Sequence, residues 1–552
     1  MEIALRLWAI VKTDALLRLR RTSTLVLMLI TGFFAYSMVP DPASGQGLFV
    51  INGARTLYNS ASISFATSML CSMLGIGLFG FYMVSNSIRR DVDSHVGGIL
   101  AATPMRSWEY LFGKFLGNVA FLSLLTLVFM LAMMGMYALR GEAPFELLVF
   151  VRTYVVMCAS ATVFVAVVAL VFESLPVLSG RVGDVVYFFL WVAALAVPIV
   201  QMEGKMAAQR MNTGVAALPL SFSDIPWAAY IDVFGMGAGM MSVNAQMQAV
   251  SNGFSIGSSP FDPHLAPVVL REITLPGDWW LVKILSLLAM TSVLSLAYIA
   301  FHRFDPTRVK ATVRQSRKNI FAAINLALKP INTATMAVWN AVLPRMGGNA
   351  VVAAVLGELF VLIAQKPLAL VCIVALNAAS FLMPLDSVQA KLLPIASVVF
   401  VITCSSIALR ERQRGTTSLM WSLPAMKPHF VWIKLTAAYL LALALVVVPF
   451  VRLVVDSPST GLSLLVGMLF LSAAAVALGT VSGTAKVFVV CSLLLFYLCL
   501  NMGANVPAMD FAGWYGTADT GVQAGYCAGS ALLLVLGYVV HRIRAEGRGK
   551  YF

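Results

Sequence analysis

The chain has 552 residues, of which 60% are hydrophobic and 11% are charged, and its mean hydropathy is +0.88. A typical soluble domain carries about 25% charged residues, so this composition excludes an ordinary soluble protein and predicts one that lies in a lipid bilayer. The formal net charge of +14 could indicate nucleic acid as a partner, but the basic residues are distributed in a way that argues against it.

The chain opens with an amphipathic stretch, residues 2–21, in which Asp14 and several arginines interrupt apolar residues. This pattern is typical of a helix in the cytoplasmic interface of a membrane, and it differs from a cleavable signal peptide. We expect an interfacial helix here, with Asp14 and the later Arg21 as its notable charges.

Apolar segments long enough to approach a membrane crossing recur along the rest of the chain. About 20 apolar residues are needed to span roughly 30 Å of hydrocarbon. The expected cores are 23–40, 62–86, 116–138, 152–172, 182–200, 279–301, 367–384, 392–408, 435–455, 462–481, 485–503 and 523–541. We therefore predict an all-α polytopic membrane protein with about 12 transmembrane helices in two pseudo-symmetric six-helix halves.

Two long connections divide this series. The first, at about residues 201–278, is expected to form a small, partly helical extracytoplasmic cap that could bind an extracytoplasmic partner. Trp279 and Trp280 at its end are typical of a membrane interface. Residues 302–350 contain a basic run and several prolines and glycines, and they are expected to be a cytoplasmic linker. The expected domains are thus 1–301, the linker 302–350, and 351–552. The second half opens with Glu358 and Lys366, much as the first opens with Asp14 and Arg21.

One short passage occurs twice, and the second copy follows the first by 320 residues. Copy one runs from Arg90-Asp91 to Thr103-Pro104, followed by Tyr110 and Lys114; copy two runs from Arg410-Glu411 to Leu423-Pro424, followed by Phe430 and Lys434. Basic, acidic, aliphatic, proline, aromatic and lysine positions coincide without a gap. Self-similarity of this kind indicates two structural halves and, in a membrane chain, a transporter with a pseudo-two-fold axis.

The basic residues gather in alternate connections, including those that hold both copies of the passage. These residues are Arg18, Arg20, Arg21, Arg89, Arg90, Arg303, Arg308, Lys310, Arg314, Arg317, Lys318, Arg410, Arg412, Arg414, Arg542, Arg544, Arg548 and Lys550. Such asymmetry is the positive-inside pattern, which predicts that both termini and both copies lie in the cytoplasm. Membrane orientation thus accounts for the excess charge, and we expect no nucleic-acid partner.

Each copy follows an apolar span. Its proline, Pro104 or Pro424, separates it from the next apolar segment. Between these limits, apolar residues (Ile99 and Leu100; Leu419 and Met420) alternate with polar ones. The pattern suits a short helix on the membrane surface that offers one apolar face to another protein. A solvated connecting loop is the alternative, and recurrence in both halves favours the helix.

These passages resemble the cytoplasmic motif of type-2 ABC exporter permeases, which are membrane subunits that partner separate ATP-hydrolysing subunits. The resemblance implies that residues 91–104 and 411–424 are coupling helices in the clefts of two copies of an ABC ATPase subunit. It implies that Arg90, Asp91, Arg410 and Glu411 anchor the starts of these helices and that His95 and Gly415 lie at the closest approach. Gly98 and Ser418 stand where the family commonly has a second acid, so no ion pair to the ATPase is expected there.

The chain contains no G-x-x-x-x-G-K-[ST] phosphate loop, so we expect it to be a transport subunit rather than an enzyme. ATP and Mg would be bound by the partner ATPase, and no cofactor or metal by this chain. Its seven cysteines show no metal-site spacing and indicate no disulfide framework. The expected location is the bacterial cytoplasmic membrane, in contact with membrane lipid.

In the resembled family the second and fifth spans of each half line the transport route. Polar but uncharged, methionine and aromatic residues occur on these spans, and they suit a lipophilic or amphipathic cargo. The candidate route residues are Thr67, Ser68, Met69, Ser72, Tyr187, Phe188, Ser405, Ser492 and Asn501. Ordinary helix packing is the alternative interpretation of each, and it applies equally to Asn377 on the seventh span.

Two other functions are alternatives. A gradient-driven secondary transporter would also have repeats, but the near absence of charge in mid-span argues against it. An intramembrane enzyme acting through loop acids such as Asp232, Asp262 and Glu272 is the third possibility, and no pattern arranges these acids into a site.

Overall fold

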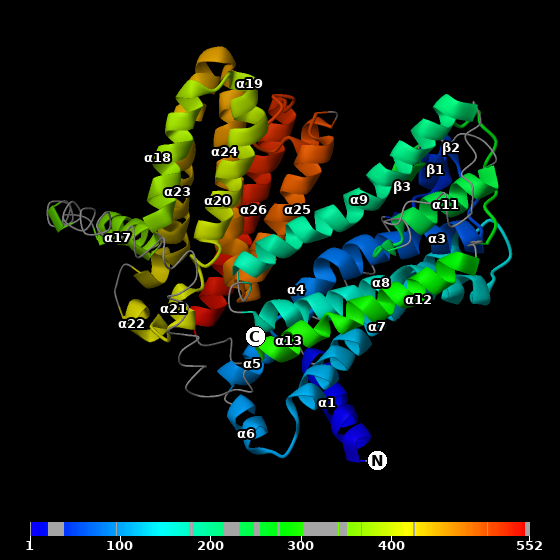
Figure 1. Ribbon diagram of the computed structural model, residues 1–552. Helices are drawn as coiled ribbons and strands as arrows, with labels where there is room; N and C mark the ends of the chain where they lie inside the picture. Colours follow the sequence, from blue (N-terminus) through cyan, green and yellow to red (C-terminus); the bar gives the residue numbers. More distant parts are fainter. Residues whose placement is uncertain are drawn as a thin grey trace. The chain divides into compact units, whose positions relative to one another are not determined.

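The structure is a computed structural model (Figure 1). It describes residues 2–19, 38–94, 96–175, 178, 181–213, 231–247, 254–272, 277–301, 340–341, 350–365, 367–422, 426–504 and 506–546. The chain divides into two compact units, Met1–Val313 and Arg314–Phe552, which are called the front and rear units below.

The front unit is built mainly from long helices. In chain order they are α1 (Glu2–Leu19), α3 (Ser60–Leu70), the π-helix η2 (Cys71–Gly80), α4 (Phe81–Val84), α5 (Ser87–Asp93), α6 (Val96–Ala102), α7 (Ser107–Arg140), α8 (Leu147–Ser174), α9 (Arg181–Thr213), α11 (Met236–Met247), α12 (Gly277–Ser292) and α13 (Leu294–Ala300). The central helix is α8, which packs against α3, η2, α7, α12 and α13. Its buried side is rich in alanine, valine and small polar residues, which permit close approach of neighbouring helices.

The rear unit has helices in a similar order, with a shorter connection before its last helix. Its helices are α17 (Ala350–Gln365), α18 (Pro367–Leu382), α19 (Leu385–Ser387), the π-helix η5 (Val388–Leu392), α20 (Leu393–Cys404), α21 (Arg410–Gln413), α22 (Thr417–Trp421), α23 (Met426–Asp456), α24 (Pro458–Ser482), α25 (Ala485–Met502) and α26 (Thr520–Ala545). Here α24 is central, against α20, α23, α25 and α26. In both units the fourth predicted span therefore packs against the second, the third and the sixth.

The chain is a membrane-embedded, predominantly α-helical protein. Within the described residues, nine helices are long and apolar enough to cross a membrane, and a bent pair, Ala350–Ala364 with Leu368–Leu382, adds a further candidate. The bend of 91° between these two helices suits an interfacial helix that turns into a span. The expected span 23–40 lies largely outside the described residues, and the apolar part of α25 is short, Ala485–Leu500. The total of twelve membrane spans therefore remains a prediction.

A three-stranded sheet departs from the all-α expectation. Its order is β2 (Ala54–Arg55), β1 (Gln46–Ile51) and β3 (Phe254–Pro260), and both pairings are antiparallel. Sequence analysis missed it because β1 and β3 are separated by some 200 residues and each is short. The sheet joins the connection after the first predicted span to the expected cap of residues 201–278. Within that cap, α9 continues as a helix to Thr213, beyond the predicted end of the fifth span at residue 200.

The repeated passages are each two short helices, whereas one short helix was expected. In the front unit α5 ends at Asp93 and α6 begins at Val96; in the rear unit α21 ends at Gln413 and α22 begins at Thr417. Gly415 lies in the rear break with φ +68°, a left-handed conformation that glycine adopts without the steric cost of a Cβ atom. The acid of each passage therefore belongs to the first helix, and the exposed apolar residues belong to the second.

Candidate functional site

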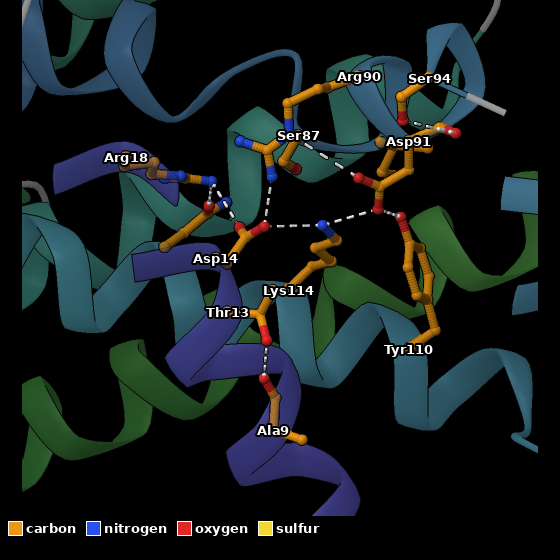
Figure 2. A network of polar contacts seen from close by, with 12 residues as sticks. Ala9, Thr13, Asp14, Arg18, Ser87, Arg90, Asp91, Ser94, Tyr110 and Lys114 are labelled. Atoms are coloured by element: carbon orange, nitrogen blue, oxygen red, sulfur yellow. Dashed lines mark hydrogen bonds and ion pairs between the residues drawn. The ribbon is translucent and has the colours of Figure 1, made fainter. Parts of the chain in front are cut away.

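A cluster of buried charges lies at the base of the front passage (Figure 2). At its centre is Asp14 of α1, which is 2% exposed. Its Oδ1 atom accepts hydrogen bonds from Arg90 Nη2 of α5 at 2.5 Å and from Lys114 Nζ of α7 at 2.9 Å. Its Oδ2 atom accepts from Arg18 Nη2 at 3.0 Å, one turn along α1. One carboxylate thus joins the opening helix, the repeated passage and the next membrane helix.

The second acid of the cluster is Asp91. Its Oδ2 atom lies 2.8 Å from Lys114 Nζ and accepts a hydrogen bond of 2.8 Å from the Tyr110 hydroxyl. Figure 2 shows the lysine between the two carboxylates, with the tyrosine on the far side of Asp91. Lys114 therefore links Asp14 to Asp91 and fixes α5 to the start of α7.

Electrostatics explain how these charges are tolerated out of water. Burial by itself raises the pKa of Asp14, but the nearby cations Lys114, Arg18 and Arg90 outweigh it, and the net pKa lies below the ordinary value of 3.8. A buried ion costs several kcal/mol in desolvation unless close partners and hydrogen bonds compensate it. Each acid here has such partners, so the cluster is an internal connector whose charges are mostly directed at each other.

The rear unit contains a matching cluster. Glu358 of α17 accepts from Arg410 Nη2 at 2.9 Å and from Lys434 Nζ at 2.6 Å, and Lys434 also donates to Glu411 Oε1 at 2.5 Å. The Lys434 side chain is fully buried. The same four roles recur: an acid from the opening helix, an arginine and an acid from the repeated passage, and a lysine from the following membrane helix.

Two differences separate the clusters. At the position of Tyr110 the rear unit has Phe430, which has no hydroxyl to donate, and Glu411 Oε2 is buried without a hydrogen-bond partner. Leu362 stands one turn after Glu358, where Arg18 follows Asp14 in the front unit. The rear cluster is therefore a reduced version of the front one.

Aromatic stacking ties each cluster to the end of the sixth span of its half. The Tyr110 ring stacks on Phe301 with centroids 5.4 Å apart, and the Phe430 ring stacks on His541 at 4.7 Å. His541 Nε2 also lies 3.0 Å from the Lys427 carbonyl oxygen. In both units, the third span is thus connected to the sixth beside the charge cluster.

The front passage is additionally held at its beginning by α8. The Glu173 carboxylate accepts hydrogen bonds from the backbone N–H groups of Ser87 and Ile88 at 2.9 and 2.6 Å. These N–H groups open α5, where a negative charge is favourable because the first N–H groups have no partner within the helix. Below them, Ile88, Leu111 and Phe115 pack into a buried core with Leu170.

The predicted coupling residues fall into two groups. Arg90, Asp91, Arg410 and Glu411 take part in the buried clusters, and no contact on another chain is needed to explain them. Ile99 of α6 and Leu419 of α22 are 69% and 68% exposed, while Leu100 and Met420 are half-buried and Pro104 is exposed. His95 and Pro424 lie outside the described residues, as do Arg21 and Lys366.

The candidate route residues are buried within their own units. Thr67 donates to the Ile63 carbonyl and accepts from the Tyr154 hydroxyl at 2.9 Å; Ser68 donates to the Phe65 carbonyl. The side chains of Met69, Ser72, Tyr187, Phe188, Ser405 and Ser492 are buried as well, and the Asn501 side chain lies outside the described residues. Their role in a route stays a prediction, since burial also suits helix packing.

The register of Lys114 with Lys434 and the likeness of Asp14 to Glu358 are visible in the sequence, but only the structure brings these residues into one site. The signal was present, because an acid, an arginine–acid pair and a lysine recur in the same order in each half. The comparisons add nothing to it, since the chain matches no protein-family model, no curated protein and no solved structure. The functional argument rests on the geometry of the two clusters.

Proposed function

We propose that the chain is the transmembrane permease subunit of a type-2 ABC exporter, with two six-span halves fused in one chain. The observation that carries the proposal is the duplicated cluster, Asp14–Arg90–Asp91–Lys114 and its rear equivalent. Each cluster joins a short helix pair to the opening helix of its unit and to the membrane helix that follows the pair. If another protein moves the helix pair, a connection of this kind is needed to transmit the movement to the membrane-spanning helices.

The exposed residues support a docking role for the second helix of each pair. Ile99 and Leu419 are large aliphatic residues, and each is about two-thirds exposed on a short helix beside a charged, well-fixed base. Apolar residues exposed at corresponding positions of both halves suit a partner that has two equivalent clefts. Two copies of an ABC ATPase subunit fit this description, and one permease chain would then serve one transporter.

The energy source in this proposal is the partner. ATP and Mg would bind between the ATPase copies, and closure of those copies would move the two passages and, through the clusters, the spans. The cargo proposed is lipophilic or amphipathic, because the candidate route is lined by methionine, aromatic and hydroxyl side chains. The proposed location is the bacterial cytoplasmic membrane, with both termini and both passages in the cytoplasm.

The test uses the exposed residues, because substitutions at Asp91 or Glu411 would disturb the clusters as well as any docking. Ile99→Glu and Leu419→Glu place a charge where the partner's apolar cleft is expected, and Ile99→Leu and Leu419→Met are the matched controls. We expect the glutamate variants to fold normally, to lose copurification of the ATPase subunit from the native host, and to lose export. Retention of the ATPase and of export in the double glutamate variant would contradict the proposal.

A further inference from the structure

An aromatic side chain from the connection between spans five and six is buried against span two of the front unit. Phe234, which precedes α11, has no exposed surface. A Cβ atom added to Gly77 of η2 would lie 2.7 Å from Phe234 Cε1, so the ring rests directly on the backbone of the π-helix. Its other side meets Phe164 of α8 edge-on, with centroids 6.0 Å apart.

The segment around Phe234 is shaped to hold the ring in this position. Gly235 has φ +83°, and a Cβ atom there would lie 2.8 Å from Met157 Sδ. A Cβ atom on Gly239 would lie 3.0 Å from Phe65 Cζ. Glycine therefore allows the segment to turn sharply and to approach α3 and α8 closely. Two residues before Phe234, the Asp232 carbonyl oxygen accepts a 2.6 Å hydrogen bond from the buried Lys283 Nζ.

Span five closes on the same stretch of span two. Trp191 Nε1 donates to the Met73 carbonyl at 2.9 Å, and the Tyr187 hydroxyl donates to the Gly77 carbonyl. From span two, the Tyr82 hydroxyl donates to the Asp184 carbonyl at 2.7 Å. Asp184, Tyr187 and Trp191, at intervals of about one turn, thus join α9 to η2 and α4. Gly77 contacts both span five and Phe234. π-Helical turns are frequent at functional sites.

We propose that Phe234 is a plug that closes the route between spans two and five of the front half from the extracytoplasmic side, with Gly77 as its seat. The inference rests on the proposed function, in which these two spans line the route. The ring is supplied by the connection between spans five and six and by neither of the two spans that would line the route. In the rear unit, Ser397 stands 320 residues after Gly77, the spacing of the two passages. Its hydroxyl donates to the Leu393 carbonyl of its own helix at 2.9 Å.

The chain provides its own reporters for a test. Cys158 follows Met157, against which Gly235 rests, and its Sγ atom lies 3.6 Å from the Ser68 carbonyl oxygen; Cys71 begins η2. Both thiols are buried. With the other five cysteines replaced by serine or alanine, the full chain in proteoliposomes is exposed to a membrane-impermeant maleimide from the extracytoplasmic side.

We expect Phe234→Ala to raise the labelling rate by about tenfold, because water reaches the vacated seat. Gly77→Ala, which displaces the ring, has the same effect, and the double variant labels no faster than Phe234→Ala alone. Phe189→Ala is the matched control, since Phe189 is 57% exposed, and Phe234→Leu keeps an apolar plug if the alanine variant is unstable. Labelling of both Phe234 variants at the wild-type rate, with unchanged thermal unfolding, would overturn the plug.

Labelling in this assay needs neither nucleotide nor partner, which separates the two proposals. Co-reconstitution with the copurified ATPase, with ATP enclosed in the vesicle lumen on the cytoplasmic side, is expected to raise labelling of the protein that retains Phe234. If Phe234→Ala raises labelling but ATP and the ATPase leave the Phe234 protein unchanged, the plug stands and the proposed energy source fails.

Discussion

Asp91 accepts a 2.8 Å hydrogen bond from the Tyr110 hydroxyl, and this bond has no counterpart in the rear unit because phenylalanine occupies the corresponding position. A hydrogen bond to a charged group contributes about 1.5–3 kcal/mol. Tyr110→Phe removes only the hydroxyl and keeps the ring on Phe301, so we expect the free energy of unfolding to fall by about 1–3 kcal/mol. Thermal unfolding in detergent measures it, and an unchanged midpoint would show that Asp91 does not depend on this bond.

The reverse substitution is expected to stabilise the protein. Glu411 Oε2 is buried without a hydrogen-bond partner, and Phe430 stands where a tyrosine would reach toward it by analogy with the front unit. Phe430→Tyr should therefore raise the free energy of unfolding by about 1 kcal/mol. The same unfolding assay checks it, with Phe430→Leu as the control that also loses the stack on His541. A lower midpoint for the tyrosine variant would mean that the rear cluster has no room for the hydroxyl.

Lys434 is the residue on which the rear cluster depends most. It is fully buried between Glu358 and Glu411. Its removal leaves Glu358 paired with Arg410 and takes from Glu411 the cation that it contacts. We expect Lys434→Met to cost about 3–5 kcal/mol, because removing one partner leaves a buried charge uncompensated. The double variant Lys434→Met with Glu411→Leu should regain part of that loss. If the single variant unfolds at the wild-type temperature, the cluster does not hold the rear passage.

Acid should weaken the front cluster only at low pH. Because the pKa of Asp14 in the folded protein lies below the ordinary 3.8, its stabilising contribution is fully present above that value. It is lost as the pH falls through the lower folded pKa. The stability difference between the wild type and Asp14→Asn should thus be constant from about pH 5 to pH 8 and shrink below about pH 4. Unfolding of both proteins across this range tests it, and a difference that already shrinks near pH 6 would contradict the lowered pKa.

Much of the architecture could be predicted from hydropathy, because long apolar runs, positive connections and the duplicated passage are local signals. The charge clusters could be predicted only in part. The register of Lys114 with Lys434 was visible, but the meeting of Asp14 with a lysine 100 residues away depends on how α1 packs along α7. The π-helix η2 leaves no mark in composition, since its residues are as apolar as those of an α-helical span.

A polar residue on the seventh span shows why the candidate route could not be predicted residue by residue. The sequence left Asn377 open as a route residue or a packing residue, and the structure gives it a definite partner. Its Nδ2 atom donates to the Ala444 carbonyl at 3.0 Å, and its Oδ1 atom accepts from the Val448 N–H at 2.9 Å. These backbone groups flank a break in α23, where Val446 is non-helical and Pro449 follows.

In an unbroken helix the Val448 N–H would donate to the Ala444 carbonyl, so Asn377 bridges the two groups that the break at Val446 separates. Asn377→Leu would leave the part-buried Val448 N–H without this partner, at a cost of about 1–3 kcal/mol. Asn377→Gln, which keeps both polar groups on a longer side chain, is the closest control and should lose less. Because the role is structural, export normalised to the amount of folded protein should be unchanged in the leucine variant, and a loss of normalised export with full stability would instead place Asn377 in the route.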